Sequence, residues 1–138
     1  MRYIIADIHG CYNEYINFLK KIKFTDKDTL YILGDVVDRG PEPIKILQDM
    51  MKRKNVVRFI GNHEFMMYTI LKKLTVEITA ENCENYLDAD DILKYNLWLQ
   101  NGGYTTLKQF FKSFTRRKRR YIRLYRRLLI LRNHQLQQ

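Results

Sequence analysis

Three short apolar runs alternate with longer amphipathic stretches over the first half of the chain. The apolar runs cover residues 3–6, 29–33 and 56–60 and are rich in β-branched and aromatic side chains, as buried strands are. Between them, apolar residues recur every three or four positions over residues 12–22 and from residue 41 to about residue 54, the spacing that gives a helix one buried face. This alternation predicts an α/β fold built on a mostly parallel sheet.

The second half of the chain is predicted to be helical. Residues 65–74 are apolar with helical spacing, and the stretch around residues 80–100 is acidic with the same spacing. We therefore expect a helical insert at about residues 76–101. Gly102 and Gly103 interrupt the pattern, and a further short helix is expected over residues 104–114.

Each predicted strand is followed by a loop of glycine and polar residues. The carboxyl ends of parallel strands lie along one edge of a sheet, where α/β proteins bind their ligands. We therefore expect the three loops to converge. They read Asp7-Ile8-His9-Gly10, Gly34-Asp35-Val36-Val37-Asp38-Arg39-Gly40 and Gly61-Asn62-His63-Glu64.

The loops combine carboxylate, imidazole and amide donors. This mixture suits divalent first-row metals such as Mn, Fe, Zn or Co, and a carboxylate can bridge two of them. Two ions about 3.5–4 Å apart can polarise a phosphoryl group and lower the pKa of a bound water towards about 7. The loops therefore point to phosphoester hydrolysis.

The three loop motifs resemble those of the calcineurin-like metallophosphoesterases, and within them the phosphoprotein phosphatase branch. That branch reads Gly-Asp-x-His-Gly, Gly-Asp-x-x-Asp-Arg-Gly and Gly-Asn-His-Glu, and this chain departs only at Ala6, where the family usually has glycine. The resemblance covers residues 1 to about 111. The run at residues 101–106, Asn-Gly-Gly-Tyr-Thr-Thr, is similar to that of bacterial and phage-type serine/threonine phosphatases and the related bis(5′-nucleosyl)-tetraphosphatases.

The resemblance implies a role for each polar loop residue. His63 would be the general acid, Asp38 would orient it, and Arg39 would bind a phosphate oxygen; alternatively, Asp38 and Arg39 could form an ion pair that stabilises the loop. Glu64 is expected to be structural, because a carboxylate in the first turn of a helix is favoured by the helix dipole. The implied metal ligands are Asp7, His9, Asp35 as the bridging ligand, and Asn62.

The resemblance also implies a fold and an activity. The fold is the N-terminal half of a metallophosphoesterase α/β/β/α sandwich. The activity is hydrolysis of phosphoserine or phosphothreonine in proteins, by a water activated between two divalent ions, with Mn favoured and Fe, Zn or Ni also suitable. The alternatives are hydrolysis of bis(5′-nucleosyl) tetraphosphates and a non-catalytic, truncated fold that binds nucleic acid.

Part of the family pattern is missing from this sequence. The family completes its second metal site with two later histidines and adds a second phosphate-binding arginine. The one further histidine, His134, lies in Arg132-Asn133-His134-Gln135 and matches neither histidine pattern. We therefore expect an incomplete second metal site and reduced or absent activity.

The net charge of +10 is confined to the end of the chain. Residues 1–111 contain 15 acidic and 15 basic residues, whereas residues 112–138 contain eight Arg, two Lys and no acid. We divide the chain into a domain at residues 1–111 and a basic tail or helix at residues 112–138. The tail could bind nucleic acid through phosphate contacts, lie on an anionic membrane, or be the frameshifted end of a longer gene. The abrupt change in Arg and Lys usage favours the frameshift.

The remaining composition indicates a reducing compartment. Two cysteines, Cys11 and Cys83, are too few for a disulfide framework. The chain has no run of about 18 apolar residues that would span a membrane, and polar residues interrupt the apolar N-terminus before a signal core can form. We expect a cytoplasmic protein.

Overall fold

A computed structural model describes residues 1–114 and contains one small parallel sheet. Its strands are β1 (Arg2–Ile5), β2 (Thr29–Ile32) and β3 (Val56–Arg58), in the spatial order β1-β2-β3. Both strand pairs are parallel. The predicted α/β fold with a parallel sheet is confirmed, and each strand lies within two residues of its expected bounds.

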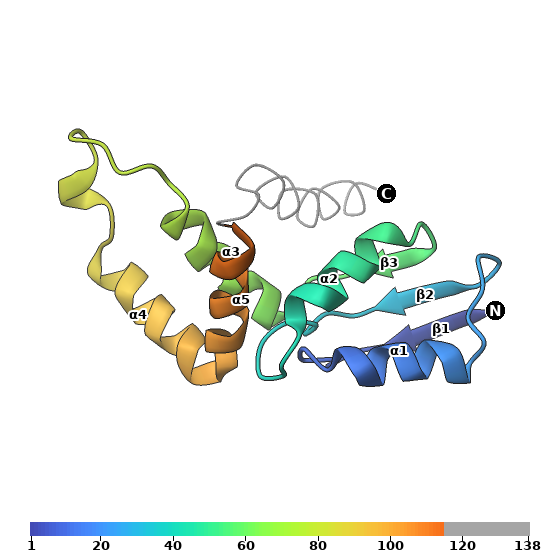
Figure 1. Cartoon of the computed structure of the whole chain (residues 1–138). Coiled ribbons are helices and arrows are strands. Elements are labelled where there is room, and N and C mark those ends of the chain that lie inside the picture. The colour runs from blue at the N-terminus through green and yellow to red at the C-terminus, as the bar shows by residue number, and fades with distance from the viewer. Residues whose placement is uncertain (115–138) are drawn as a thin grey trace, which may run out of the picture.

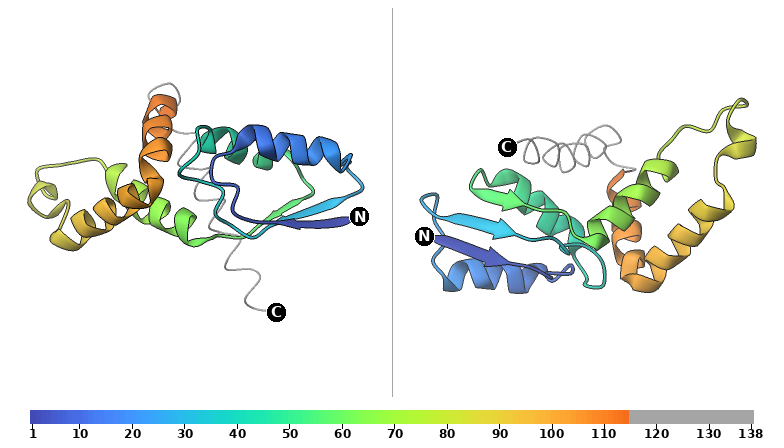
Figure 2. Two further views of the ribbon diagram at one scale, coloured as in Figure 1. Left: turned by 90° about the horizontal axis from the view of Figure 1, so that it is seen from below. Right: turned by 180° about the vertical axis from the view of Figure 1, so that it is seen from behind.

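Two helices cover one face of this sheet (Figures 1 and 2). They are α1 (Tyr12–Lys21), between β1 and β2, and α2 (Pro43–Lys52), between β2 and β3. The core lies between the helices and the sheet and includes Leu30 and Ile32 of β2 and Ile46 of α2, all with 0% exposure. The amphipathic spacing seen in the sequence therefore buries one face of each helix.

The other face of the sheet is not covered by any of the described helices, as the view from behind in Figure 2 shows. Ile4 of β1 is 67% exposed. Leu33 and Phe59, just beyond β2 and β3, are also exposed. The described part of the chain thus forms one sheet layer with one helix layer packed on it.

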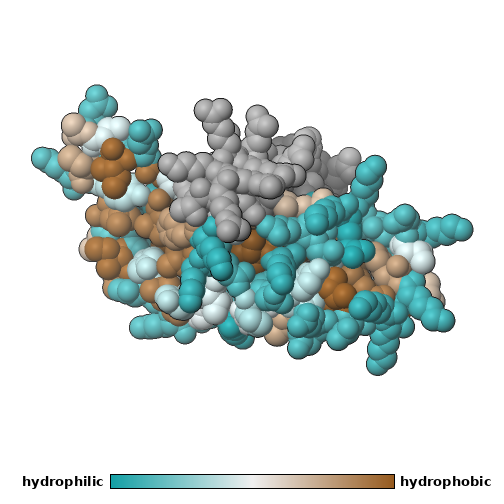
Figure 3. Space-filling view, in the orientation of Figure 1, coloured by the Kyte–Doolittle hydropathy of each residue, from teal (hydrophilic) through white to brown (hydrophobic). Residues whose placement is uncertain are grey.

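The rest of the described chain is helical and lies beside the sheet, beyond the polar ends of the strands (Figure 1). Its elements are α3 (Asn62–Leu74), the short 3-10 turn η1 (Cys83–Asn85), α4 (Ala89–Trp98), the wide turn η2 (Leu99–Gly103) and α5 (Tyr104–Phe114). Figure 3 shows apolar side chains gathered over this region. Three residues of α4, Ile92, Leu93 and Leu97, are exposed.

The insert is less helical at its start than the sequence predicts. Thr79 N–H donates to the side chain of Asn82 at 2.9 Å, and the Asn82 amide donates to the Glu77 carbonyl at 3.0 Å. Side-chain bonds of this kind compete with helical hydrogen bonds. The long helix begins only after Asp88, whose carboxylate caps it by accepting from Asp91 N–H at 2.7 Å.

The predicted basic segment at residues 112–138 begins within the last turn of α5, and from residue 115 onward it lies outside the described residues. The three interpretations of that segment, and His134, fall in this part of the chain. Within residues 1–114, no helix combines the length and the apolar character needed to cross a membrane.

Replacing Ile46 by alanine tests the packing of α2 on the sheet. Removing a fully buried branched side chain costs about 2–5 kcal/mol of unfolding free energy, so we expect urea unfolding at a lower midpoint with an unchanged slope. Ile78→Ala removes the same atoms from a side chain that is 60% exposed and should change stability by less than about 0.5 kcal/mol. Equal stability of the two variants would contradict this packing.

Candidate metal and phosphate site

The loops after β1 and β2 continue the pairing of the two strands. Asp7 N–H donates to the Gly34 carbonyl at 3.3 Å, and His9 N–H donates to the Asp35 carbonyl at 2.9 Å. Gly40 N–H donates back to the His9 carbonyl at 2.8 Å. The first and second polar loops are therefore fixed side by side through their backbones.

Glycine is required where the second and third loops meet. Gly34 has φ of 109°, and a Cβ at this position would lie 2.3 Å from the backbone nitrogen of Gly61. A Cβ on Gly61 would lie 2.3 Å from Oδ1 of Asp35. Contacts this short are not possible between non-bonded atoms, so the Gly-Asp and Gly-Asn pairs of the motifs follow from this close approach.

Five polar residues of the first two loops have left-handed backbone conformations. Non-glycine residues seldom adopt positive φ, and each such residue costs of the order of 1–3 kcal/mol unless its surroundings fix it. Clusters of such residues are typical of functional sites. They are Asp7 at 57°, His9 at 43°, Asp35 at 53°, Asp38 at 70° and Arg39 at 63°.

Three of the four predicted metal ligands form one cluster. Asp7, His9 and Asp35 each place a ligand atom within 4.8 Å of the others. The His9 Nδ1 lies 3.1 Å from the Val37 carbonyl, to which it donates, so the lone pair of the imidazole is on Nε2. That Nε2 lies 3.8 Å from Oδ1 of Asp7. Two carboxylates and a neutral imidazole are donors that divalent first-row metals accept, so these residues fit a metal ion.

The fourth predicted ligand, Asn62, lies on the other side of Asp35. It is the first residue of α3, which begins three residues earlier than the sequence predicts. With its amide nitrogen turned toward Asp35, it donates to both carboxylate oxygens, at 2.9 and 3.0 Å. Rotating the amide by half a turn brings its oxygen to the same place. Asp35 therefore lies between Asn62 on one side and Asp7 and His9 on the other, as a bridging ligand would.

His63, the predicted general acid, is buried and held at both ring nitrogens. Its Nδ1 lies 2.8 Å from Oδ2 of Asp38, and its Nε2 lies 3.2 Å from a terminal nitrogen of Arg39. Because a guanidinium can only donate, Nε2 accepts and Nδ1 carries the proton. Residues 1–114 contain no ion pair between Asp38 and Arg39, so the simple loop ion pair is not formed. The centroids of the His63 and His9 imidazole rings are 4.7 Å apart.

Asp38 is fully buried, and its carboxylate accepts hydrogen bonds from the helical region. The Trp98 indole donates to Oδ2 at 2.9 Å, and the Thr106 hydroxyl donates to Oδ1 at 2.7 Å. The sequence alone assigned neither Trp98 nor Thr106 a role in the site. The one signal that could have singled out Thr106 is the Asn-Gly-Gly-Tyr-Thr-Thr run, which ends on it.

Glu64 is structural, as predicted, but mainly through specific hydrogen bonds. Its Oε1 accepts from the N–H groups of Val36 and Val37, at 2.8 and 3.1 Å. Its Oε2 accepts from the N–H groups of Asp35 and Gly61, at 2.8 and 2.9 Å. One buried carboxylate thus fixes the second loop against the start of α3.

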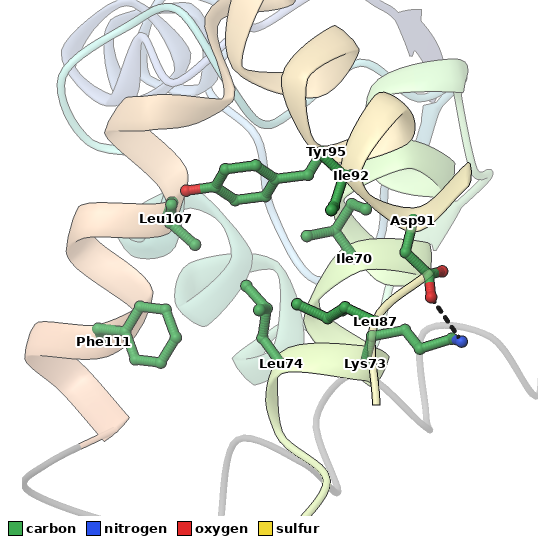
Figure 4. A pocket seen from close by; sticks show the side chains of 9 residues that line it. All are labelled: Ile70, Lys73, Leu74, Leu87, Asp91, Ile92, Tyr95, Leu107 and Phe111. Carbon is green, nitrogen blue, oxygen red and sulfur yellow. Dashed lines mark hydrogen bonds and ion pairs between the residues drawn. The ribbon is translucent and has the colours of Figure 1, made fainter. Parts of the chain in front are cut away.

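A separate apolar hollow of about 310 Å³ lies among α3, α4 and α5 (Figure 4). Ile70, Tyr95 and Leu107 lie along it, one from each helix, and the ion pair between Lys73 and Asp91, 2.8 Å long, borders it. That ion pair lowers the pKa of the Asp91 carboxyl and raises the pKa of the Lys73 ammonium. None of the predicted site residues lines the hollow, so the candidate chemistry belongs to the strand-end loops.

Glu64→Gln tests the hydrogen bonds that hold the second loop. An amide offers one acceptor oxygen where the carboxylate offers two, so backbone N–H groups lose their partner and unfolding free energy should fall by about 1–3 kcal/mol. Urea unfolding measures this loss. Glu84→Gln, at an exposed position of η1, is the matched control. If Glu64→Gln were as stable as that control, the four bonds would not hold the loop.

Asp35→Asn tests the metal cluster without any assay of activity. Since Asp35 lies between the other ligands, we expect Mn²⁺ affinity to fall tenfold or more, about the loss seen even when outer-shell partners of a metal are removed. Electron paramagnetic resonance of free Mn²⁺ during titration measures the affinity. Asp26→Asn, at an exposed turn, should bind like the parent chain. Equal Mn²⁺ binding by both variants would exclude Asp35 as a ligand.

The sequence matches one known protein family and several curated relatives. Residues 3–136 match the family described as calcineurin-like phosphoesterase. Three curated relatives are named as symmetrical bis(5′-nucleosyl)-tetraphosphatases. They come from Buchnera aphidicola subsp. Schizaphis graminum, Erwinia tasmaniensis and Salmonella paratyphi B, and they are 36%, 33% and 34% identical to this chain over 100 residues. These alignments cover 71% of this chain and 37%, 36% and 36% of the relatives, so the chain spans little over a third of their length. With the motifs and the loop geometry, the match over most of its length shows that this chain belongs to the calcineurin-like phosphoesterase family.

Proposed function

We propose that this chain contributes the phosphate-cleaving site of a metal-dependent hydrolase of dinucleoside polyphosphates. The observation that carries the proposal is the cluster of Asp7, His9 and Asp35, with His63 and Arg39 beside it. The sequence alone favours phosphoproteins as substrates and gives dinucleoside tetraphosphates as the alternative. The curated relatives are named as symmetrical bis(5′-nucleosyl)-tetraphosphatases, which favours that alternative.

The metal requirement follows from the donor set. Asp7, His9 and Asp35 would hold one divalent ion, and Asp35 and Asn62 would begin a second site. Such ions polarise phosphoryl oxygens and lower the pKa of bound water. Mn²⁺ is our preferred ion because carboxylate and amide oxygens dominate the set.

Arg39 and His63 would act on the substrate phosphate itself. Arg39 is an exposed residue whose backbone N–H is bonded to the Gly102 carbonyl. Its guanidinium would turn from His63 to bind a phosphate oxygen, for which its planar fork is suited. That movement would free Nε2 of His63, which accepts from the guanidinium, to take up a proton from water and pass it to the leaving oxygen. Asp38 would keep the proton of the imidazole on Nδ1 and so direct Nε2 to the substrate.

The bonds that change follow from the class of substrate. Symmetrical cleavage of a bis(5′-nucleosyl) tetraphosphate breaks the central P–O–P link and forms two nucleoside diphosphates. A water oxygen would bond to one phosphorus and release a proton, and the bridging oxygen would leave with the other half and take the proton from Nε2 of His63. No redox step or further reactant is required.

Turnover of diadenosine tetraphosphate by the full 138-residue chain with Mn²⁺ tests this proposal. We expect ADP as the product by anion-exchange chromatography, and loss of turnover by a factor of about 10² or more in His63→Gln, as for removal of a general acid. Asp35→Asn should also be inactive. Loss of turnover in Asp35→Asn is also the control for contaminating phosphatases, and Asp26→Asn, at an exposed turn, should keep the parent rate.

The same preparation should be assayed with a phosphoserine peptide. Hydrolysis of the peptide without hydrolysis of diadenosine tetraphosphate would overturn the proposed substrate class in favour of phosphoproteins. Absence of turnover on both substrates, from folded chain that binds Mn²⁺, would overturn the proposal that this chain is itself catalytic.

A further inference from the structure

The helical region after α3 reaches back into the site through two side chains. Trp98, at the end of α4, and Thr106, in the first turn of α5, are both fully buried. They are 60 and 68 residues from Asp38 along the sequence, yet both donate a hydrogen bond to its carboxylate. Among residues 1–114, two of the three side chains bonded to this carboxylate therefore come from α4 and α5.

The direction of each hydrogen bond is fixed by chemistry. The Asp38 backbone N–H, which can only donate, is 2.9 Å from the Thr106 hydroxyl oxygen. That oxygen therefore accepts, and its own proton points to Oδ1 of Asp38 at 2.7 Å. The Trp98 indole can also only donate. Both carboxylate oxygens are thus acceptors, which leaves the carboxylate as the acceptor for Nδ1 of His63 as well.

Two glycines allow the helices to come this close to the loop. The Gly102 carbonyl accepts from Arg39 N–H at 3.0 Å, and a Cβ on Gly102, whose φ is 96°, would lie 2.8 Å from Cγ of Arg39. A Cβ on Gly103 would lie 2.5 Å from the Trp98 ring. The Gly-Gly pair therefore fits the turn between α4 and α5 against the loop that carries Asp38 and Arg39.

We propose that Trp98 and Thr106 are positioning residues for the proposed hydrolysis. They hold the Asp38 carboxylate in the orientation that keeps His63 in its protonated-Nδ1 form and aims Nε2 at the substrate. The segment from α4 to α5 is then part of the catalytic machinery and not only an insert packed beside it. This inference rests on the proposed function for its catalytic consequence, but the positioning can be measured without turnover.

Simple packing does not explain the choice of these side chains. Valine has the shape of threonine and would fill the same space at position 106. In the described part of the chain, the hydrogen bonds of the Trp98 indole and the Thr106 hydroxyl go to Asp38 alone. Their polar atoms are therefore used for the carboxylate next to His63.

The test compares Thr106→Val with Thr106→Ser in the full chain. Valine removes the hydroxyl and keeps the shape, whereas serine keeps the hydroxyl. Thr69→Val, which removes a hydroxyl bonded only to the Phe65 carbonyl of its own helix, is the matched control. Trp98→Phe is the second variant, because it removes the indole N–H and keeps a ring against Gly103.

Proton NMR provides the direct measurement. An imidazole N–H bonded to a carboxylate gives a strongly downfield signal, and its loss in His63→Gln would identify the His63 Nδ1–H. The chain has one tryptophan, so the single indole N–H signal belongs to Trp98. We expect Thr106→Val and Trp98→Phe to lose or shift the His63 signal, and Thr106→Ser and Thr69→Val to retain it. Thr106→Val should also shift the indole signal.

Kinetics on diadenosine tetraphosphate provide the second measurement. We expect kcat of Thr106→Val to fall by up to about 10²-fold with KM nearly unchanged, since a small misplacement of a catalytic group can cost that much. Thr106→Ser should restore most of the rate. If the parent chain has no turnover, the proposed function fails while the NMR signals still decide the positioning.

Two results would overturn the inference. One is an unchanged His63 signal in folded Thr106→Val and in Trp98→Phe. The other, when the parent chain has turnover, is equal kcat in Thr106→Val and the parent chain. If Thr106→Val does not fold, as judged by circular dichroism, Trp98→Phe and Thr106→Ser carry the decision.

Discussion

The convergence of four backbone N–H groups on the buried Glu64 carboxylate is the interaction on which the site depends. Those groups belong to Asp35, Val36, Val37 and Gly61. Hydrogen bonds to a charged acceptor contribute about 1.5–3 kcal/mol each, enough to offset the unfavourable left-handed conformations on either side. With this segment fixed, Asp35 faces Asp7 and His9 and Asp38 faces the helices, so one carboxylate aligns the two halves of the candidate site.

The sheet and the helices supply different parts of the site. The sheet brings together Asp7, His9 and Asp35, because parallel strands of similar length end at one edge and their loops continue the pairing. The helices supply the partners of Asp38, because Trp98 and Thr106 lie where α4 and α5 approach the second loop. The arrangement of Asp7, His9 and Asp35 thus comes from the sheet and its loops, whereas two of the hydrogen bonds to Asp38 come from the helices.

Much of the fold could be predicted because it depends on local signals. The strands and helices that frame the site follow from runs of apolar residues and from three- and four-residue spacing, and they lie close to their expected bounds. The first part of the predicted insert is not helical, because the side-chain bonds of Thr79 and Asn82 form a turn that periodicity does not register. The early start of α3 at Asn62 depends on Glu64, whose carboxylate accepts from Gly61 N–H and so caps the helix.

The sequence by itself determined which donor residues the candidate site contains and that their loops lie at one sheet edge, because motif chemistry and strand order are properties of the chain. Only the tertiary structure decided what holds those residues. The partners of Asp38 lie 60 and 68 residues away, and nothing in the composition or spacing of a tryptophan and a threonine indicates that they meet a carboxylate. Such contacts arise from the packing of helices against a loop, which depends on shape and on the two glycines that permit the approach.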